Sequence, residues 1–227
     1  MFKRIPELKR LTEQVDERAA LIHNMVDEIP HLTWDEIDSL EFENGVYLIF
    51  ESGETIRETK RIVRVGTHTK DDLLKRRLKN HYIGTNKDGS IFRKNIGLAL
   101  LNKDQDEFLD VWRLNTSSPK VKEENKDRLN SAYKKEIENR VSDYLRENTK
   151  FLCIEVDSKE ERLRLEEGLI ALFGRNKKFK ASDKWLGNYH PDSKIRESYL
   201  WNKQGLNGEP LSLDEVRALA KRQTNRE

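Results

Sequence analysis

Three groups of side chains in this sequence have types and spacings that could act on a phosphate ester. Tyr47 lies in an apolar, strand-like run. Arg77 and His81 are four residues apart, so on a helix they share one face, where an arginine could hold a phosphate oxygen and a histidine could transfer protons. Glu166 and Glu167 lie in another helix-like run, and a carboxylate beside its apolar face is a candidate Mg²⁺ ligand. The ordinary alternatives are an aromatic residue on a sheet face, a solvated basic helix and surface glutamates.

Several common catalytic motifs are absent. The sequence holds no Walker loop, no G-x-G-x-x-G, no H-E-x-x-H and no G-x-S-x-G. His68, His81 and His190 are too scattered to indicate a zinc site by spacing alone. The candidate chemistry therefore rests on the tyrosine, the arginine–histidine pair and the carboxylates.

The elements that must position these groups follow from hydrophobic periodicity. Two capping boxes, Thr33 to Glu36 and Ser212 to Glu215, mark the starts of short helices, and Ser52–Gly53 is the expected hairpin turn. In chain order we predict an amphipathic helix over the first thirty residues closed by Pro30, strands over 45–50 and 61–66, helices over 71–81, 90–101 and 123–147, a strand over 151–156, a helix over 159–173, and a last helix near 212. This order predicts an α+β fold with a small antiparallel β-sheet flanked by helices.

We predict three segments. Residues 1–39 form an N-terminal helical segment, residues 40–205 form the central domain, and residues 206–227 form a C-terminal helical tail. The central domain carries a helical insertion at about 85–147. Within it, the polar stretch 115–125 is the best linker candidate.

The net charge of +2 conceals segregation along the chain. The chain has 43 Lys and Arg against 41 Asp and Glu, which argues against binding through bulk positive charge. No Lys or Arg occurs between Arg18 and Arg57, whereas the stretch 58–82 is strongly basic, as is 175–184. Solvated faces are the ordinary interpretation, but this pattern also suits a local site for an anionic partner.

The compartment is predicted from cysteine usage and hydropathy. Cys153 is the single cysteine, which excludes a disulfide framework and fits a reducing cytoplasm. The apolar runs 46–50 and 169–173 are far shorter than the roughly 20 residues of a membrane span, and no signal peptide is recognisable at the N-terminus. We expect a cytoplasmic protein without membrane contact.

Several short motifs in order resemble the GIY-YIG nuclease superfamily: Gly45-Val46-Tyr47, then Arg64-Val65-Gly66, then Arg77 with His81, then Glu166 in LEEGLI. The likeness to one bacterial subgroup is closer and spans about residues 40–205. It lies in IVRVGTH (62–68), LKRRLKNH (74–81), GSIFRKNIGLALL (89–101), VSDYLRENTKFLCIEVDS (141–158), LEEGLIALF (165–173), SDKWLGNYHP (182–191) and ESYLWN (197–202). Each motif is weak, but seven in order are specific.

The resemblance implies metal-dependent phosphodiester hydrolysis. In that scheme Tyr47 is the general base for the attacking water, and Arg77 clamps the scissile phosphate with help from His81. Glu166 ligates one Mg²⁺ or Mn²⁺. We choose Glu166 over Glu167 because it lies four residues before Ile170, which is the placement usual in the family.

Two positions depart from the family pattern. Arg64 stands where the second motif normally has a tyrosine, so either Arg64 contacts phosphate directly or the site is tuned differently. The family also has an asparagine after the metal-binding helix. Here we favour Asn202, with Asn188 in reserve, and the alternative is an asparagine that stabilises a turn.

Further residues are candidates for DNA contact. Ser90 and Arg93, at the start of an expected helix, could receive a phosphate on free backbone N–H groups, although a helix cap with a solvated arginine is equally consistent. His68 closes the IVRVGTH segment, and Lys177 and Lys178 lie in the second basic cluster.

The sequence thus predicts a DNA endonuclease that depends on Mg²⁺ or Mn²⁺, with a restriction or anti-phage role as one setting. The alternative is a nucleic-acid-binding module that keeps the fold without cleaving, for which Arg64 is the best argument. An interaction protein built on the N-terminal helix explains only residues 1–30. The expected partner is DNA, and cutting both strands with one active site per chain suggests a homodimer or two binding events.

Overall fold

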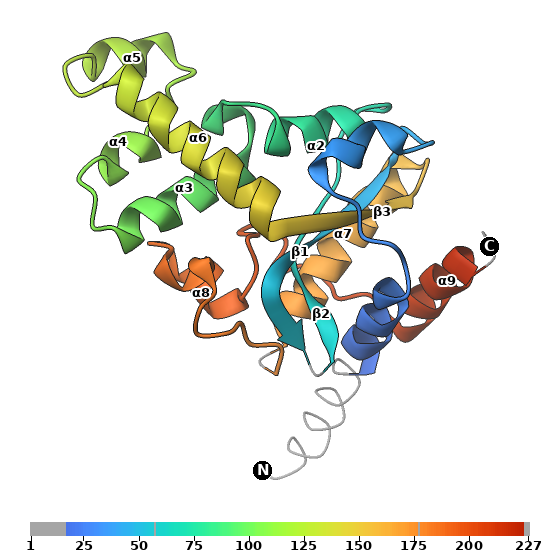
Figure 1. Cartoon of the computed structure of the whole chain (residues 1–227). Helices are drawn as coiled ribbons and strands as arrows, with labels where there is room; N and C mark the ends of the chain where they lie inside the picture. The colour runs from blue at the N-terminus through green and yellow to red at the C-terminus, as the bar shows by residue number, and fades with distance from the viewer. Residues whose placement is uncertain (1–16, 57, 177, 225–227) are drawn as a thin grey trace, which may run out of the picture.

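A small antiparallel sheet lies at the centre of the molecule (Figure 1). The computed structural model describes residues 17–56, 58–176 and 178–224. Within them, β1 (Gly45–Ile56) pairs with β2 (Thr59–Gly66) on one side and with β3 (Thr149–Glu155) on the other, in the order β2-β1-β3. Helices surround the sheet, so the predicted α+β class with a small antiparallel sheet is confirmed.

The side chains of the central strand alternate between two cores, as the period of two along a strand requires. Tyr47 and Ile49 belong to one buried cluster, and Val46, Leu48 and Phe50 belong to the other. All five are at most 3% exposed, so β1 is covered on both faces. The sheet is therefore the middle layer between two sets of helices.

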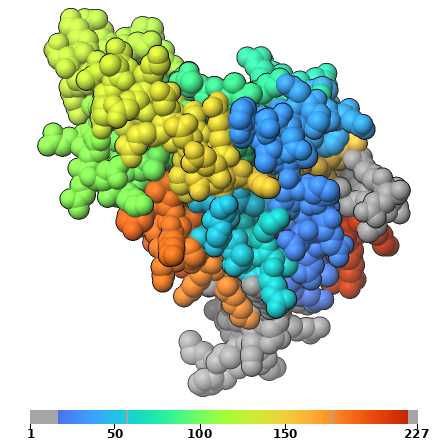
Figure 2. Space-filling view, viewed as in Figure 1, coloured from blue at the N-terminus to red at the C-terminus, as the bar shows by residue number. Residues whose placement is uncertain are grey.

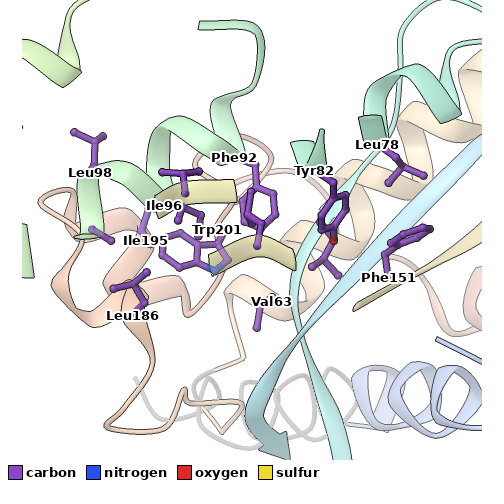
Figure 3. Close-up of a cluster of buried hydrophobic side chains, with 14 of the residues drawn as sticks. Val63, Leu78, Tyr82, Phe92, Ile96, Leu98, Phe151, Leu186, Ile195 and Trp201 are labelled. Carbon is purple, nitrogen blue, oxygen red and sulfur yellow. The ribbon is translucent and has the colours of Figure 1, made fainter. Parts of the chain in front are cut away.

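The first core lies between the sheet and helices α2 (Leu74–Tyr82), α3 (Ile91–Lys103) and α6 (Ser131–Asn148). Figure 3 shows Phe92 beside Trp201 in the middle of this cluster, and Tyr82 near Phe151 toward one end. Ser90 caps α3 by accepting the amide hydrogen of Arg93, as the sequence predicts. This core fixes α2, which carries Arg77 and His81, and α3, which begins after Ser90 and carries Arg93.

The second core lies on the other face. It is formed by α7 (Lys159–Gly174), α9 (Leu213–Thr224) and the helix over residues 17–27, whose Ala19, Ile22 and Val26 are fully buried. The first half of the predicted N-terminal helix lies outside the described residues. The capping box of Ser212 with Glu215 is confirmed by reciprocal bonds of 2.7 and 3.2 Å.

The hairpin turn is not where the sequence places it. β1 continues through Ser52–Gly53 to Ile56, which pairs with Thr59. Gly53 instead lies in an irregular stretch of the β1–β2 pairing, with a φ of 80° that suits glycine. The prediction of a turn at Ser52–Gly53 was wrong because glycine also marks strand irregularities.

The predicted helix over 123–147 is also wrong, because it is divided in two. The chain forms α5 (Pro119–Glu124), then breaks and restarts as α6, whose first turn is capped by the Asn130 side chain. A short helix, α4 (Leu109–Arg113), precedes them and was not predicted. Helix α5 and the beginning of α6 project from the body of the molecule at the upper left of Figures 1 and 2, whereas the rest of α6 packs into the first core.

Short elements close the remaining gaps. Single turns of 3-10 helix, η1 (Trp34–Ser39) and η2 (Lys87–Gly89), precede β1 and α3, while η3 (Leu186–Tyr189) and α8 (Ser193–Ser198) follow α7. The segment after α8 then runs along the free edge of β2, where the amide of Trp201 donates to the carbonyl of Val63 (2.8 Å). No helix in the described part of the chain combines the length and apolarity needed to cross a bilayer.

Candidate active site

A chain of buried hydrogen bonds links three elements of the first core. The hydroxyl oxygen of Tyr47, on β1, lies 2.8 Å from Nε2 of His81 in the last turn of α2. His81 Nδ1 lies 2.7 Å from Oγ of Ser90, the residue that caps α3. All three side chains are fully buried, so the sequence-distant residues form one connected polar unit.

The surrounding charges favour one protonation pattern for this unit. Burial, reinforced by the guanidinium groups of Arg64, Arg77 and Arg93, holds the pKa of His81 well below its usual value, so the imidazole is neutral. Ser90 Oγ also accepts the amide hydrogen of Arg93 (3.2 Å). A neutral imidazole donates through one nitrogen and accepts through the other, so His81 links the hydroxyl groups of Tyr47 and Ser90 in one hydrogen-bonded chain.

Gly66 leaves the space that Tyr47 occupies. The two residues are opposite each other in the β1–β2 pairing, and a Cβ placed on Gly66 would lie 2.1 Å from the Tyr47 hydroxyl oxygen. Any larger residue would displace the phenol. The glycine of the second motif is thus required by the tyrosine of the first.

Glu166, on α7, is hydrogen-bonded to the backbone of Thr67, the residue that follows Gly66. Its Oε1 accepts the amide hydrogen of Thr67 at 3.1 Å. Burial raises the pKa of the Glu166 carboxyl above its usual value, and the opposing effects of Arg64, the Thr67 amide and Arg77 reduce that rise. The carboxylate therefore lies among positive groups in a partly dehydrated place, which suits it to bind a cation.

A cleft of about 940 Å³ opens beside Glu166, where β2, α2, α3, α7 and the segment after α8 meet. Its charged lining residues are five basic side chains against two carboxylates: Arg64, Arg77, Arg164, Lys194 and Lys203, with Glu166 and Glu167. Such an excess of positive charge around a concave site attracts anions. The structure thus brings Arg64, Arg77, Glu166 and Asn202 of the predicted site to one cleft.

Arg64 is held firmly at the base of this cleft. It is 4% exposed, its guanidinium lies 5.0 Å from the Phe92 ring centroid, and Nη1 donates to the carbonyl of Trp201 at 3.1 Å. Its Nε has no hydrogen-bond partner among the described residues. Arg77 is less buried, and its Nη1 is 3.5 Å from the carbonyl of Gly89. Arg64 is thus a fixed cation, whereas Arg77 is freer to follow a ligand.

Tyr47 and His81 do not line the cleft. Both are fully buried, on the inner side of the guanidinium groups of Arg64 and Arg77, which are near enough to lower the pKa of His81. Tyr47, which the sequence predicts as the general base, and His81 therefore lie beneath the cleft. They reach a substrate water only if the cleft tightens around the substrate. Catalytic hydrogen bonds are often long in ligand-free sites and shorten when the substrate binds.

Both polar atoms of the Asn202 side-chain amide form hydrogen bonds with the edge of the sheet. Its Oδ1 accepts from the Val65 amide at 3.0 Å and its Nδ2 donates to the Val65 carbonyl at 2.9 Å. The side chain thus imitates a neighbouring strand and fixes the cleft wall to β2. Asn188, the reserve, donates to the carbonyls of Ser182 and Asp183 within its own loop.

Other predicted contact residues are used inside the protein. Arg93 is fully buried, pairs with Glu138 at 2.8 Å and donates to the His81 carbonyl at 3.0 Å. His68 is 5% exposed, and its Nε2 accepts from the Gly45 amide while Nδ1 lies 2.6 Å from the Lys70 carbonyl. Neither side chain lines the cleft, and nor does Ser90.

The second basic cluster lies elsewhere. Lys178 is exposed on the loop after α7 and is not among the lining residues of the cleft. Lys177 lies outside the described residues.

Five polar lining residues of the cleft were not predicted from the sequence: Asn95, Arg164, Lys194, Lys203 and Gln204. The available signals were indirect, since Asn95 lies within the GSIFRKNIGLALL motif and Lys203 adjoins Asn202.

The donor set of the cleft fits a magnesium-type ion that is held mainly by substrate and water. In the described part of the chain, no group of three or more His, Cys, Asp or Glu side chains could hold a metal by itself. Mg²⁺ in phosphate-handling sites typically takes one or two carboxylates and completes its shell with water and phosphate oxygens. Glu166, with Glu167 as a second carboxylate at the same cleft, meets that requirement.

Comparison with known proteins identifies the domain. The model of the GIY-YIG domain family matches residues 7–225. No curated protein and no solved structure matches the chain significantly.

Proposed function

The chain belongs to the GIY-YIG domain family, and from this we propose that it is an active endonuclease. The nuclease-type domain covers nearly the whole sequence. The proposed reaction is the hydrolysis of DNA phosphodiester bonds with the help of Mg²⁺ or Mn²⁺. One observation carries the proposal. Glu166, Arg64 and Arg77 line the same cleft, and both guanidinium groups are near enough to influence the Glu166 carboxyl and the buried His81, which is hydrogen-bonded to Tyr47.

Each residue has a distinct task in this proposal. Arg77 and Arg64 bind the non-bridging oxygens of the scissile phosphate and offset the negative charge that grows on them. Tyr47, which shares a hydrogen bond with His81, acts as the general base that takes a proton from the attacking water. The water oxygen then bonds to phosphorus as the bond to the leaving oxygen breaks.

Glu166 would hold the metal ion, which when bound supplies Lewis-acid stabilisation to the phosphate and leaving-group oxygens. The amide of Thr67 orients the Glu166 carboxylate through the 3.1 Å hydrogen bond. Asn202 holds the cleft wall in register with β2 through Val65. These residues act by position, without exchanging protons.

The decisive experiment is cleavage of supercoiled plasmid DNA by the whole chain with Mg²⁺, Mn²⁺ or EDTA. We expect nicked or linear product with either metal and none with EDTA. Activity that persists in EDTA would contradict metal dependence. Linear product without a nicked intermediate would support two chains acting together, as the homodimer hypothesis requires.

A non-cleaving DNA-binding module is the second candidate, favoured by two observations. Tyr47 is fully buried in this structure, and Arg64 occupies the place of the family's second tyrosine. If the protein binds DNA with a steep salt dependence but cuts nothing with any metal, this second function is the correct one.

We extend the first proposal to restriction or anti-phage defence. A cell that expresses the chain should then resist phage infection, and a cell that expresses Tyr47→Phe should not. Equal plating of phage on both strains would contradict the defence role and leave the nuclease activity itself unaffected.

A further inference from the structure

A second hollow of about 460 Å³ adjoins the active-site cleft. The two share Ile91, Asn95 and Lys203 in their linings, so they lie on either side of the same residues. The second hollow also contains Lys94 and His190, and its volume lies in the range of small-ligand sites. None of the steps proposed above uses it.

Two buried polar atoms in its lining residues have no partner in the described part of the chain. Asn95 donates through Nδ2 to the Trp201 carbonyl, but its Oδ1 accepts from no group. His190 accepts the Asp192 amide on Nδ1, so in the neutral ring Nε2 carries the proton, and that N–H is also unpaired. Each side chain is 1% exposed, and an unpaired buried polar atom typically costs about 1–3 kcal/mol. Both atoms are closed to solvent in the free protein, so the edge of a nucleobase would complement this acceptor and this donor once the two side chains turn toward the hollow.

The positive charges of the hollow are arranged for a phosphate. Lys94 is half-buried and its ammonium has no ion-pair partner among the described residues, while Lys203 is paired with Asp192 at 2.7 Å. Burial lowers the pKa of Lys94, the negative charge of Asp88 opposes that effect, and the positive charge of Lys203 adds to it. An anion bound at Lys94 would relieve both effects.

An apolar side chain marks the junction of the two spaces. Ile91, the first residue of α3, is 46% exposed and lines both. Exposed aliphatic residues at such positions can insert between neighbouring bases and unstack them. The junction therefore has the form of a wedge between the scissile phosphate and the next nucleotide.

We propose that this second hollow receives one unstacked nucleotide of the substrate strand, directly next to the scissile phosphate. Its phosphate binds Lys94, its base meets Asn95 and His190, and Ile91 separates it from the cleft. The preferred substrate is then DNA with an unpaired or easily extruded nucleotide at the cut site. This inference rests on the proposed function, because it assigns the neighbour of the bond that is cut.

The test is binding without cleavage, in EDTA, by fluorescence anisotropy of labelled oligonucleotides. A perfect duplex is compared with the same duplex carrying one central unpaired 2-aminopurine. We expect the wild-type chain to bind the second at least about tenfold more tightly, a difference of about 1.4 kcal/mol. The 2-aminopurine emission should also rise as the base leaves the stack.

Two variants of the hollow and one control separate the explanations. Lys94→Met and Ile91→Ser should each remove most of the preference while the perfect duplex binds nearly as before, and Ile91 is exposed enough that its replacement should leave the fold intact. Lys120→Met has the same charge change on α5, where the side chain is 82% exposed, and should keep the preference.

The outcomes separate the proposed nucleotide pocket from the proposed nuclease activity. Equal affinity of the wild type for both oligonucleotides, or an equal loss for both in Lys94→Met, overturns the nucleotide pocket and leaves the nuclease proposal standing. Failure to bind any DNA overturns the nuclease proposal and the pocket with it.

Discussion

The hydroxyl oxygen of Tyr47 lies 2.8 Å from Nε2 of His81, although the two residues are 34 positions apart and belong to a strand and a helix. Ser90 holds the other nitrogen of the ring. A fully buried pair of this kind is fixed in geometry before any substrate arrives. The first predictions concern this pair and the groups around it.

Tyr47→Phe should abolish the base while keeping the ring in place. We expect cleavage to fall by roughly 10²–10⁴-fold, the range typical of a lost general base, with DNA affinity nearly unchanged. Plasmid cleavage and anisotropy measure the two quantities. Tyr189→Phe, which removes a phenol hydroxyl from a 41% exposed side chain, is the matched control and should cut normally. Cleavage by Tyr47→Phe at the wild-type rate would remove Tyr47 from the mechanism.

Glu166→Gln should separate the two neighbouring glutamates. The glutamine can still accept the Thr67 amide, so the cleft keeps its shape, but the charge that attracts a cation is gone. We expect a loss of cleavage of at least about 100-fold that excess Mn²⁺ rescues only in part. Glu167→Gln should retain activity within a few-fold. If Glu167→Gln is the more damaged variant, the metal ligand has been assigned to the wrong residue.

Gly66→Ala should disturb Tyr47 directly. The new methyl group would lie 2.1 Å from the hydroxyl oxygen and 2.2 Å from the ring carbon that carries it, so the phenol must move. We expect a loss of about 1–3 kcal/mol in the free energy of unfolding by urea, together with reduced cleavage. At Gly89 the nearest atom to an added Cβ is 3.9 Å away, so Gly89→Ala should change stability little. Similar urea curves for the two variants would contradict this packing.

Asn202→Leu should weaken the wall of the cleft. Leucine has about the size of asparagine but leaves the N–H and the carbonyl of Val65 without their partners. We expect a loss of roughly 2 kcal/mol or more in the free energy of unfolding. Asn207→Leu, at an exposed position of the same segment, is the control. Full stability of Asn202→Leu with lost cleavage would indicate a direct catalytic role for the amide.

Acid should destabilise the protein through His23. This buried ring accepts the Ile62 amide on Nε2 at 3.3 Å, and burial lowers its pKa to about 4 from an ordinary value of 6.5. The unfolded chain therefore binds the proton more readily, so the stability that His23 contributes is complete above about pH 6.5 and is lost as the pH falls toward about 4.

The size of this effect can be measured by difference. Near pH 4.5 we expect His23 alone to account for roughly 2–3 kcal/mol of the lost stability. Urea unfolding of the wild type and His23→Gln at about pH 7 and about pH 4.5 tests it, because glutamine does not titrate in this range. Since other buried histidines remain in both proteins, only the difference between the two pH slopes is assigned to His23. Parallel slopes would contradict the assignment.

The sequence by itself determined the fold class, the family and most elements of the central domain. The short apolar runs in 45–50 and 61–66 and the helical period in 159–173 predicted elements that the structure contains, because the apolar residues of each element face the core. The prediction failed at Ser52–Gly53 and at 123–147. Gly53 lies at an irregularity within the strand and not in a turn, and Asn130 caps a new helix where the sequence predicted a continuous one. Glycine occurs in both turns and strand irregularities, and asparagine occurs both within helices and at their caps, so the residue type alone does not decide.

Only the tertiary structure decided what each candidate side chain touches. From the sequence, Arg93 and His68 were as good phosphate contacts as Arg77. In the fold, however, Arg93 is buried against Glu138 and His68 connects Gly45 to Lys70, whereas Arg77 lines the cleft. The physical reason is that local sequence sets the face of a helix or strand on which a residue lies. Whether that face meets solvent, a partner charge or another strand depends on the packing of distant segments.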